Sequence, residues 1–124
     1  MGAIVVVTTV GEEERALLIA RELVARRLAA CVNVVPGMRS VYRWQGKICR
    51  DSEYLLLVKT LAGEYEAVAA AIRELHSYEL PEILAFDVTQ VDPRFLAWIG
   101  DAVDKSQPEG EDEEVGVDLD DSAF

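Results

Sequence analysis

The sequence lacks the features that mark several common classes of protein. Its longest uninterrupted apolar run, residues 67–72, has six residues, whereas a helix that spans a membrane needs about twenty. Cys31 and Cys49 are its two cysteines, too few for a disulfide scaffold and without the spacing of a zinc or redox motif. No secretory signal is readable at the N-terminus. We therefore expect reduced thiols, no membrane partner and a cytoplasmic location.

Positive charge is also scarce. The chain has 12 Lys and Arg against 23 Asp and Glu, which gives a formal net charge of -11. The last twenty residues hold eight of the acids and one of the bases, so the excess is concentrated at the C-terminus. Proteins that bind phosphate backbones need a surplus of Lys and Arg. Nucleic acid is therefore not an expected partner.

The usual catalytic motifs are missing as well. The single histidine, His76, has only Ser77 beside it, and this serine is not in a nucleophile-elbow context. The turn at Gly11 has one glycine and no lysine, and the three glutamates after it would repel phosphate. We therefore expect a protein that is not an enzyme and that needs no organic cofactor.

The remainder of the sequence predicts one α+β domain followed by a tail. Of the 124 residues, 51% are apolar, enough for a buried core. Their periodicity predicts the order strand, helix, strand, strand, helix, strand, helix, which is typical of a split β-α-β fold. We expect residues 1–104 to form the domain and the acidic residues 105–124 to be a disordered tail. The predicted elements are a strand at 4–10, a helix at 12–29, a strand at 31–35 that resumes at 40–44, a strand within 47–60, a helix at 62–76, a strand at 83–91 and a short helix from Pro93.

The segment 76–82 places an imidazole, a phenol and two carboxylates within seven positions. These side chains, His76, Tyr78, Glu79 and Glu82, are of the types that bind a metal ion or act as acid and base. A histidine at the end of a helix also caps carbonyl groups and stabilises the helix dipole. From the residues alone, both roles for His76 stay open.

Several motifs together resemble the CutA divalent-cation tolerance family. They occur in the family's order and spacing, and the similarity extends over residues 4 to about 103. The motifs are AACVN at 29–33, PG at 36–37, SVYRWQGKI at 40–48, KT at 59–60 and HSYELPE at 76–82.

This resemblance implies a ferredoxin-like βαββαβ sandwich with a long hairpin between its second and third strands, assembled into a tight homotrimer. It also implies tolerance of divalent metals and binding of copper(II), so Cu²⁺ or another divalent metal is the expected ligand. The family's metal positions are a cysteine in the first strand and two adjacent histidines. His76 matches the second histidine, Leu75 stands at the first, and Thr8 stands near the cysteine position.

Three functions are compatible with these observations. The first is a trimeric, non-catalytic protein that binds a metal ion through His76. The second is a regulator resembling the trimeric PII signalling proteins, which would bind a nucleotide or small anion between subunits through Arg39, Arg43 and Lys59. The third is an enzyme with an intersubunit cleft. The side chains of that cleft would be Trp44, Lys59, His76, Tyr78, Glu79 and Glu82.

The cleft residues also have a purely structural interpretation. In it, Lys59 and Glu82 form an ion pair and Trp44 anchors an interface, because Trp and Tyr are enriched in interface cores. We expect Trp44 to be largely buried against a neighbouring subunit.

Overall fold

The computed structural model describes residues 2–110, 112 and 113. Its elements follow the predicted order of strands and helices. A short 3₁₀ turn, η1, precedes the second helix. The elements are β1 (Ala3–Val10), α1 (Glu13–Ala25), β2 (Cys31–Trp44), β3 (Lys47–Leu61), η1 (Ala62–Glu64), α2 (Tyr65–Leu75), β4 (Leu84–Asp87) and α3 (Pro93–Ala102).

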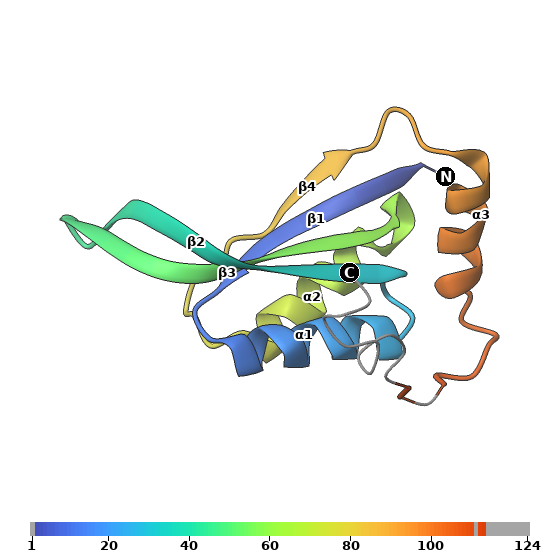
Figure 1. Ribbon diagram of the computed structural model, residues 1–124, viewed down its shortest axis with the longest axis horizontal. Helices are drawn as coiled ribbons and strands as arrows, with labels where there is room; N and C mark the ends of the chain where they lie inside the picture. Colours follow the sequence, from blue (N-terminus) through green and yellow to red (C-terminus); the bar gives the residue numbers. More distant parts are fainter. Residues whose placement is uncertain (1, 111, 114–124) are drawn as a thin grey trace, which may run out of the picture.

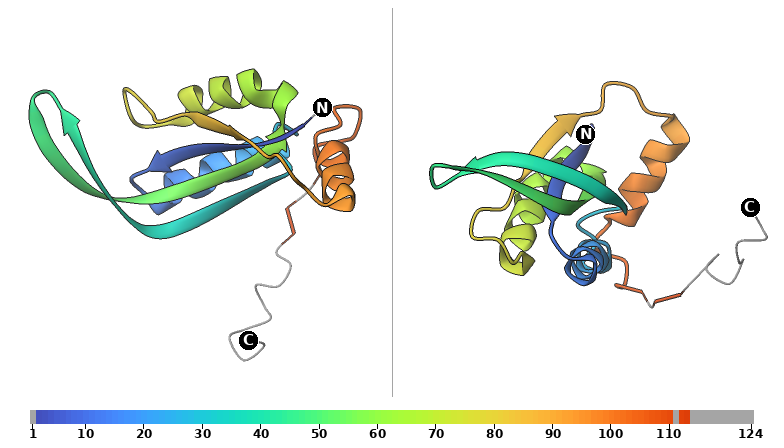
Figure 2. Two further views of the ribbon diagram at one scale, coloured as in Figure 1. Left: turned by 90° about the horizontal axis from the view of Figure 1, so that it is seen from above. Right: turned by 60° about the vertical axis from the view of Figure 1, so that its left-hand side comes forward.

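The four strands form one antiparallel sheet in the order β2-β3-β1-β4. Helices α1 and α2 lie side by side on one face of this sheet (Figures 1 and 2). Apolar side chains from the sheet and both helices interlock there, and the most deeply buried of them have no exposed surface. The core includes Val6, Val10, Ile19, Leu23, Leu56, Val58, Val68 and Ile72. The predicted α+β, ferredoxin-like fold is confirmed.

The predicted long hairpin is also present, and it extends beyond the body of the sheet (Figure 1). Strand β1 reaches only as far as the Val10–Tyr54 pair, whereas β2 and β3 stay paired out to Trp44 and Lys47. A bulge after Val35 bends β2 at this point. At the tip, both Gln45 and Gly46 have positive φ angles, as a two-residue type I′ turn requires. Among the described residues, the outer half of the hairpin therefore has no third strand beside it.

Helix α1 is shorter than the predicted 12–29 and ends at Ala25. Arg27 adopts a left-handed φ of 57°, and the Leu28 N–H donates to the Leu23 carbonyl at 3.0 Å while the Arg27 N–H donates to Val24. This is the bonding pattern of a Schellman motif. Glycine usually occupies the left-handed position. Because an arginine stands there, the sequence has no glycine to mark the end of the helix.

Strand β4 is also shorter than the predicted 83–91. It pairs only with residues Ile4 to Val7 of β1, and one further bond follows, from the Val88 N–H to the Ala3 carbonyl at 3.0 Å. Because β1 begins at Ala3, no strand in the described part of the chain lies beside residues 89–91. The run of β-type residues is therefore longer than the part of β1 that can pair with it.

Helix α3 stands at the end of the sheet opposite the hairpin tip (Figure 1). Pro93 opens it, and the Asp92 side chain accepts a hydrogen bond from the Arg94 N–H at 2.7 Å. Ile99 packs against Ala3 and Ala30 in a second, small apolar cluster. No helix in the described ranges is long and apolar enough to cross a membrane.

The predicted tail is described in part. Residues 105–110, 112 and 113 continue from α3, whereas residues 111 and 114–124 of that prediction lie outside the described residues. The division at residue 104 stays a prediction.

Candidate functional site

A cleft of about 1030 Å³ lies between the hairpin and the segment that connects α2 to β4. Strands β2 and β3 supply one wall, with Trp44 and Glu53 among its residues. Segment 77–82 supplies the other wall. The charged side chains that line the cleft are three carboxylates, Glu53, Glu79 and Glu82, and one guanidinium, Arg43. The cleft therefore carries an excess of negative charge.

His76 lies at the end of α2, where its backbone N–H donates to the Ile72 carbonyl at 2.9 Å. Its Nε2 is 2.7 Å from the Thr9 carbonyl oxygen, and its Nδ1 accepts a hydrogen bond from the Tyr78 N–H at 3.0 Å. The two bonds together require a neutral ring with the proton on Nε2. The imidazole thus joins the end of α2 to β1 and holds the start of the next segment.

Tyr78 closes the inner end of the cleft. Its hydroxyl donates to Glu53 Oε2 at 2.7 Å, and only 6% of Glu53 is exposed. Burial, and next the hydrogen bond to Glu53, raise the pKa of Tyr78 above its usual value. A Cβ atom added to Gly11 would lie 2.8 Å from the Tyr78 hydroxyl oxygen. Glycine at position 11 therefore leaves room for the Tyr78–Glu53 pair.

A second tyrosine–carboxylate pair lies further along the hairpin. The Tyr42 hydroxyl donates to Asp51, and this hydrogen bond is the main cause that raises the pKa of Tyr42 to about 12. Asp51 and Glu53 are two positions apart in β3, so their side chains project from the same face of the strand. One face of the hairpin thus carries two carboxylates, each held by a tyrosine.

The structure brings together most of the residues predicted for the cleft. Trp44, Tyr78, Glu79 and Glu82 all line it, and His76 holds the segment that carries the last three. Trp44 is 39% exposed in one chain, so its burial against a neighbour stays a prediction.

Lys59 is not among the residues that line this cleft, and its predicted place in a cleft between subunits stays a prediction. It pairs with Val5 and Cys31 in the body of the sheet, six residues along β3 from Glu53, or about 20 Å at the usual strand rise. The ion pairs among the described residues do not include the alternative Lys59–Glu82 pair.

The fit of a metal ion to these side chains can be tested directly. A metal at either nitrogen of His76 would displace the hydrogen bond to Thr9 or the one from Tyr78. Within the described part of the chain, no three His, Cys, Asp or Glu side chains lie close enough together to hold a metal ion. Cys31 and Cys49 are free thiols, and neither lines the cleft. The described residues of one subunit therefore do not contain a complete metal site of the kind implied by adjacent histidines and a cysteine.

Four residues of the site, Glu53, Asp51, Tyr42 and Gly11, do not stand out in the sequence as site residues. The alternation of Asp51 and Glu53 along a predicted strand could have identified the acidic face of the hairpin. The contact between Gly11 and Tyr78 joins two loops 67 positions apart in the chain, and no local pattern in the sequence signals it.

Comparison with known proteins gives concordant matches. The profile of the family described as "CutA1 divalent ion tolerance protein" matches residues 4–102. The chain is 46% identical over 95 residues to the divalent-cation tolerance protein CutA of Thermus thermophilus, a match that covers 77% of this chain and 92% of that protein. It is 40% identical over 97 residues to the chloroplastic protein CutA of Arabidopsis thaliana. That match covers 78% of this chain but only 53% of the plant protein, so the chain spans about half the length of that relative.

Solved structures agree with the sequence matches. The crystal structure of CutA from Xylella fastidiosa superposes with a TM-score of 0.82 at 40% identity, and the match covers 84% of this chain and 100% of that one. Residues 103–124 lie beyond the family match.

Proposed function

The chain belongs to the CutA1 divalent ion tolerance family, and from this membership we propose that it is a homotrimeric protein that binds copper(II) or a similar divalent ion without catalysing a reaction. The observation that carries the proposal is the charge of the cleft, whose lining has three carboxylates and one guanidinium. A cation gains from this arrangement, whereas a nucleotide or another anion is repelled by it. For the same reason, the cleft does not favour a PII-like regulator.

The proposal assigns the main contacts with the ion to Glu79 and Glu82. Both side chains are exposed at the rim of the cleft, where carboxylate oxygens and water can share the coordination sphere. His76 would contribute only by giving up one of its two hydrogen bonds, which makes its share of the affinity small. The occupied imidazole also leaves Ser77 without a base to activate it, which supports a non-catalytic role.

Assembly into a trimer is supported by the unpaired edges of the sheet. The outer strands are β2 and β4, and both carry exposed apolar side chains, among them Val41 at 66% and Phe86 at 56% exposure. Exposed apolar side chains on strand edges promote aggregation unless another chain covers them. Pairing between copies would cover these edges and place a strand of another chain beside the outer half of the hairpin. The cytoplasm is the compartment that we propose for the trimer.

The mass of the protein in solution tests this assembly. Light scattering at micromolar concentration should give three times the 13.7 kDa of one chain. Trp44→Ala should shift the mass toward a single chain, because truncation of a buried Trp costs about 3 to 5 kcal/mol. A single-chain mass for the parent protein would contradict the trimer.

Copper(II) titration of paired variants tests the ligand. Glu79→Gln combined with Glu82→Gln should weaken binding at about pH 7.5, where carboxylates are ionised. The control is Glu13→Gln with Glu14→Gln, which removes the same charge from the exposed start of α1. Equal copper(II) affinity of the two double variants would show that the cleft carboxylates do not bind the ion. A larger loss from His76→Ala than from the cleft variant would instead make the imidazole the main ligand. ATP titrated in parallel should give no binding, and a saturable ATP signal would favour the PII-like regulator.

A further inference from the structure

The C-terminal segment continues beyond the family match and returns to the body of the molecule. Lys105 begins it, and its Nζ donates to the carbonyl oxygens of Arg27 at 2.7 Å and Val103 at 2.9 Å and pairs with Glu64 at 2.9 Å. These contacts join the loop after α1, the end of α3 and η1. The segment therefore starts from a fixed point beside the C-terminal end of α1.

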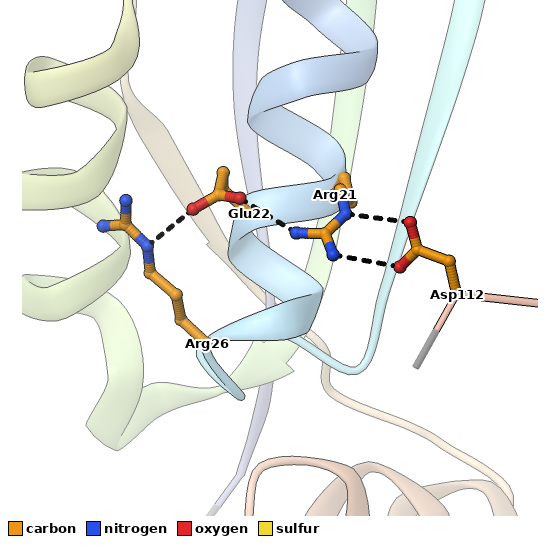
Figure 3. Close-up of polar contacts among 4 residues, drawn as sticks. All are labelled: Arg21, Glu22, Arg26 and Asp112. Carbon is orange, nitrogen blue, oxygen red and sulfur yellow. Dashed lines mark hydrogen bonds and ion pairs between the residues drawn. The ribbon is translucent and has the colours of Figure 1, made fainter. Parts of the chain in front are cut away.

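Two arginines of the α1 region then hold the segment. Arg27 Nε donates to the Pro108 carbonyl at 2.9 Å, and Arg27 Nη1 donates to the Ala102 carbonyl at 2.9 Å. Arg21, on the outer side of α1, forms a bidentate pair with Asp112 through Nε at 3.1 Å and Nη2 at 3.0 Å (Figure 3). Arg21 also pairs with Glu22, which in turn pairs with Arg26 (Figure 3). Fork-like arginine–carboxylate pairs fix geometry as well as charge.

The order of these contacts gives the segment a direction. Pro108 lies at Arg27 and Asp112 lies at Arg21, so the segment runs antiparallel to α1. Arg21 lies one turn before the end of α1, and Arg27 lies in the turn that follows the helix, so the helical part of the path between them is about 6 Å. A tail that kept this direction beyond residue 113 would pass along the N-terminal half of α1.

An exposed leucine lies on the helix surface ahead of Asp112. Leu17 precedes Arg21 by four residues and lies on the same face of the helix, and it is 53% exposed in the structure. The distance from Arg21 to Leu17 along the helix is about 6 Å. Val115 is three residues beyond Asp112, a stretch that spans up to about 10 Å when extended. The next apolar residue of the tail can therefore reach the exposed leucine.

We propose that the acidic C-terminal segment binds along the outer face of α1 of its own subunit, with Asp112 on Arg21 and Val115 on Leu17. Charge complementarity favours this occupant, since residues 105–124 have eight acids and one base and meet two arginines. The same charges limit the docked length. Glu12, Glu13 and Glu14 lie beyond Leu17 at the start of α1, and they would repel the acids at positions 118, 120 and 121 if the tail continued over them. Leu17, Arg21 and Arg27 thus form the docking surface. It binds about the first ten residues of the segment, because an extended chain reaches Leu17 at about Val115.

Disulfide trapping in the full chain tests the proposal. In a background with Cys31→Ala and Cys49→Ser, the pair Leu17→Cys with Val115→Cys should oxidise to a link within one chain. The control pair, Leu17→Cys with Ser122→Cys, places the second thiol in the part of the tail that α1 repels. We expect the first pair to link about fivefold faster than the control, and the difference to disappear in about 1 M salt, where the Debye length is near 3 Å. Equal rates for both pairs would overturn the proposal. A link between two chains would overturn docking on the same subunit and show that α1 binds the C-terminal segment of a neighbouring subunit.

Cleavage by a glutamate-specific protease gives an independent readout that needs no cysteine variants. Arg21→Glu should increase cleavage at Glu113 and Glu114 about two- to fivefold, the range that corresponds to loss of an exposed ion pair. Arg94→Glu is the matched control, because Arg94 is exposed and pairs only with Asp92 among the described residues. Unchanged cleavage in Arg21→Glu, or the same increase in both variants, would contradict docking through Arg21.

Discussion

Replacement of Gly11 by alanine should destabilise the protein only while the Tyr78 hydroxyl is present. The added Cβ would lie 2.8 Å from that oxygen and 3.6 Å from the nearest ring carbons. The first distance is too short for two atoms in contact, whereas the second is an ordinary van der Waals contact. Gly11→Ala must therefore displace the hydroxyl from Glu53, to which it donates at 2.7 Å.

The magnitude follows from the bond that is lost. A hydrogen bond to a charged group contributes about 1.5 to 3 kcal/mol, and a buried partner left without it pays a desolvation penalty. Alanine in place of glycine recovers about 0.4 to 1 kcal/mol, because it restricts the unfolded chain. Gly11→Ala should therefore lower the free energy of unfolding by about 1 to 2 kcal/mol in the parent protein, the difference between these two effects. In a Tyr78→Phe background the clash is absent, and Gly11→Ala should be neutral or slightly stabilising.

Urea unfolding of the parent protein, the two single variants and the double variant, all at the same protein concentration, measures this coupling. The single change Tyr78→Phe should itself be destabilising, because Glu53 loses its donor. Equal costs of Gly11→Ala in the two backgrounds would refute the steric argument and show that Gly11 acts through the backbone alone.

Two further predictions concern buried threonines and the hairpin. The Thr8 hydroxyl is fully buried and has no hydrogen-bond partner among the described residues, so Thr8→Val should raise the free energy of unfolding by about 1 kcal/mol. The equally buried Thr60 donates to the Leu28 carbonyl at 2.7 Å, so Thr60→Val should lower it, and urea midpoints that move in the same direction for both variants would contradict this distinction. Because the pKa of Tyr42 is raised from 10.0 to about 12, the stabilisation from its bond to Asp51 should be complete below pH 10 and should be lost as the pH rises through 12. An absorbance titration should therefore show a late tyrosine step that moves to lower pH in Asp51→Asn, and an unchanged step in this variant would disprove the assignment.

The sequence predicted the architecture well because the apolar periodicity of the strands and helices is strong. The errors lie where a local signal was misleading or where a partner was absent. Arg27 occupies a left-handed position that glycine usually fills, so the end of α1 could not be identified. Residues 89–91 have β-type composition, but β1 begins too late to pair with them. In both places, tertiary context overrode composition.

The site was predicted less completely for a related reason. Tyr78, Glu79 and Glu82 stand out as candidates because they cluster within one short segment. Glu53 and Gly11 meet that segment only in the folded chain, and the sheet register carries Lys59 away from it. Glu53 and Lys59 belong to the same strand, and the sequence does not tell which of them faces the cleft. The distance along β3 places Glu53 in the cleft and Lys59 outside it.

The position of bound copper(II) decides whether the cleft is the metal site. A crystal of the full chain soaked in copper(II) and measured at the copper absorption edge would show where the metal binds. We expect an anomalous peak at the rim of the cleft beside Glu79 and Glu82, with His76 still bonded to Thr9 and Tyr78. A peak only at a cysteine thiol, or no ordered peak at the cleft, would contradict it.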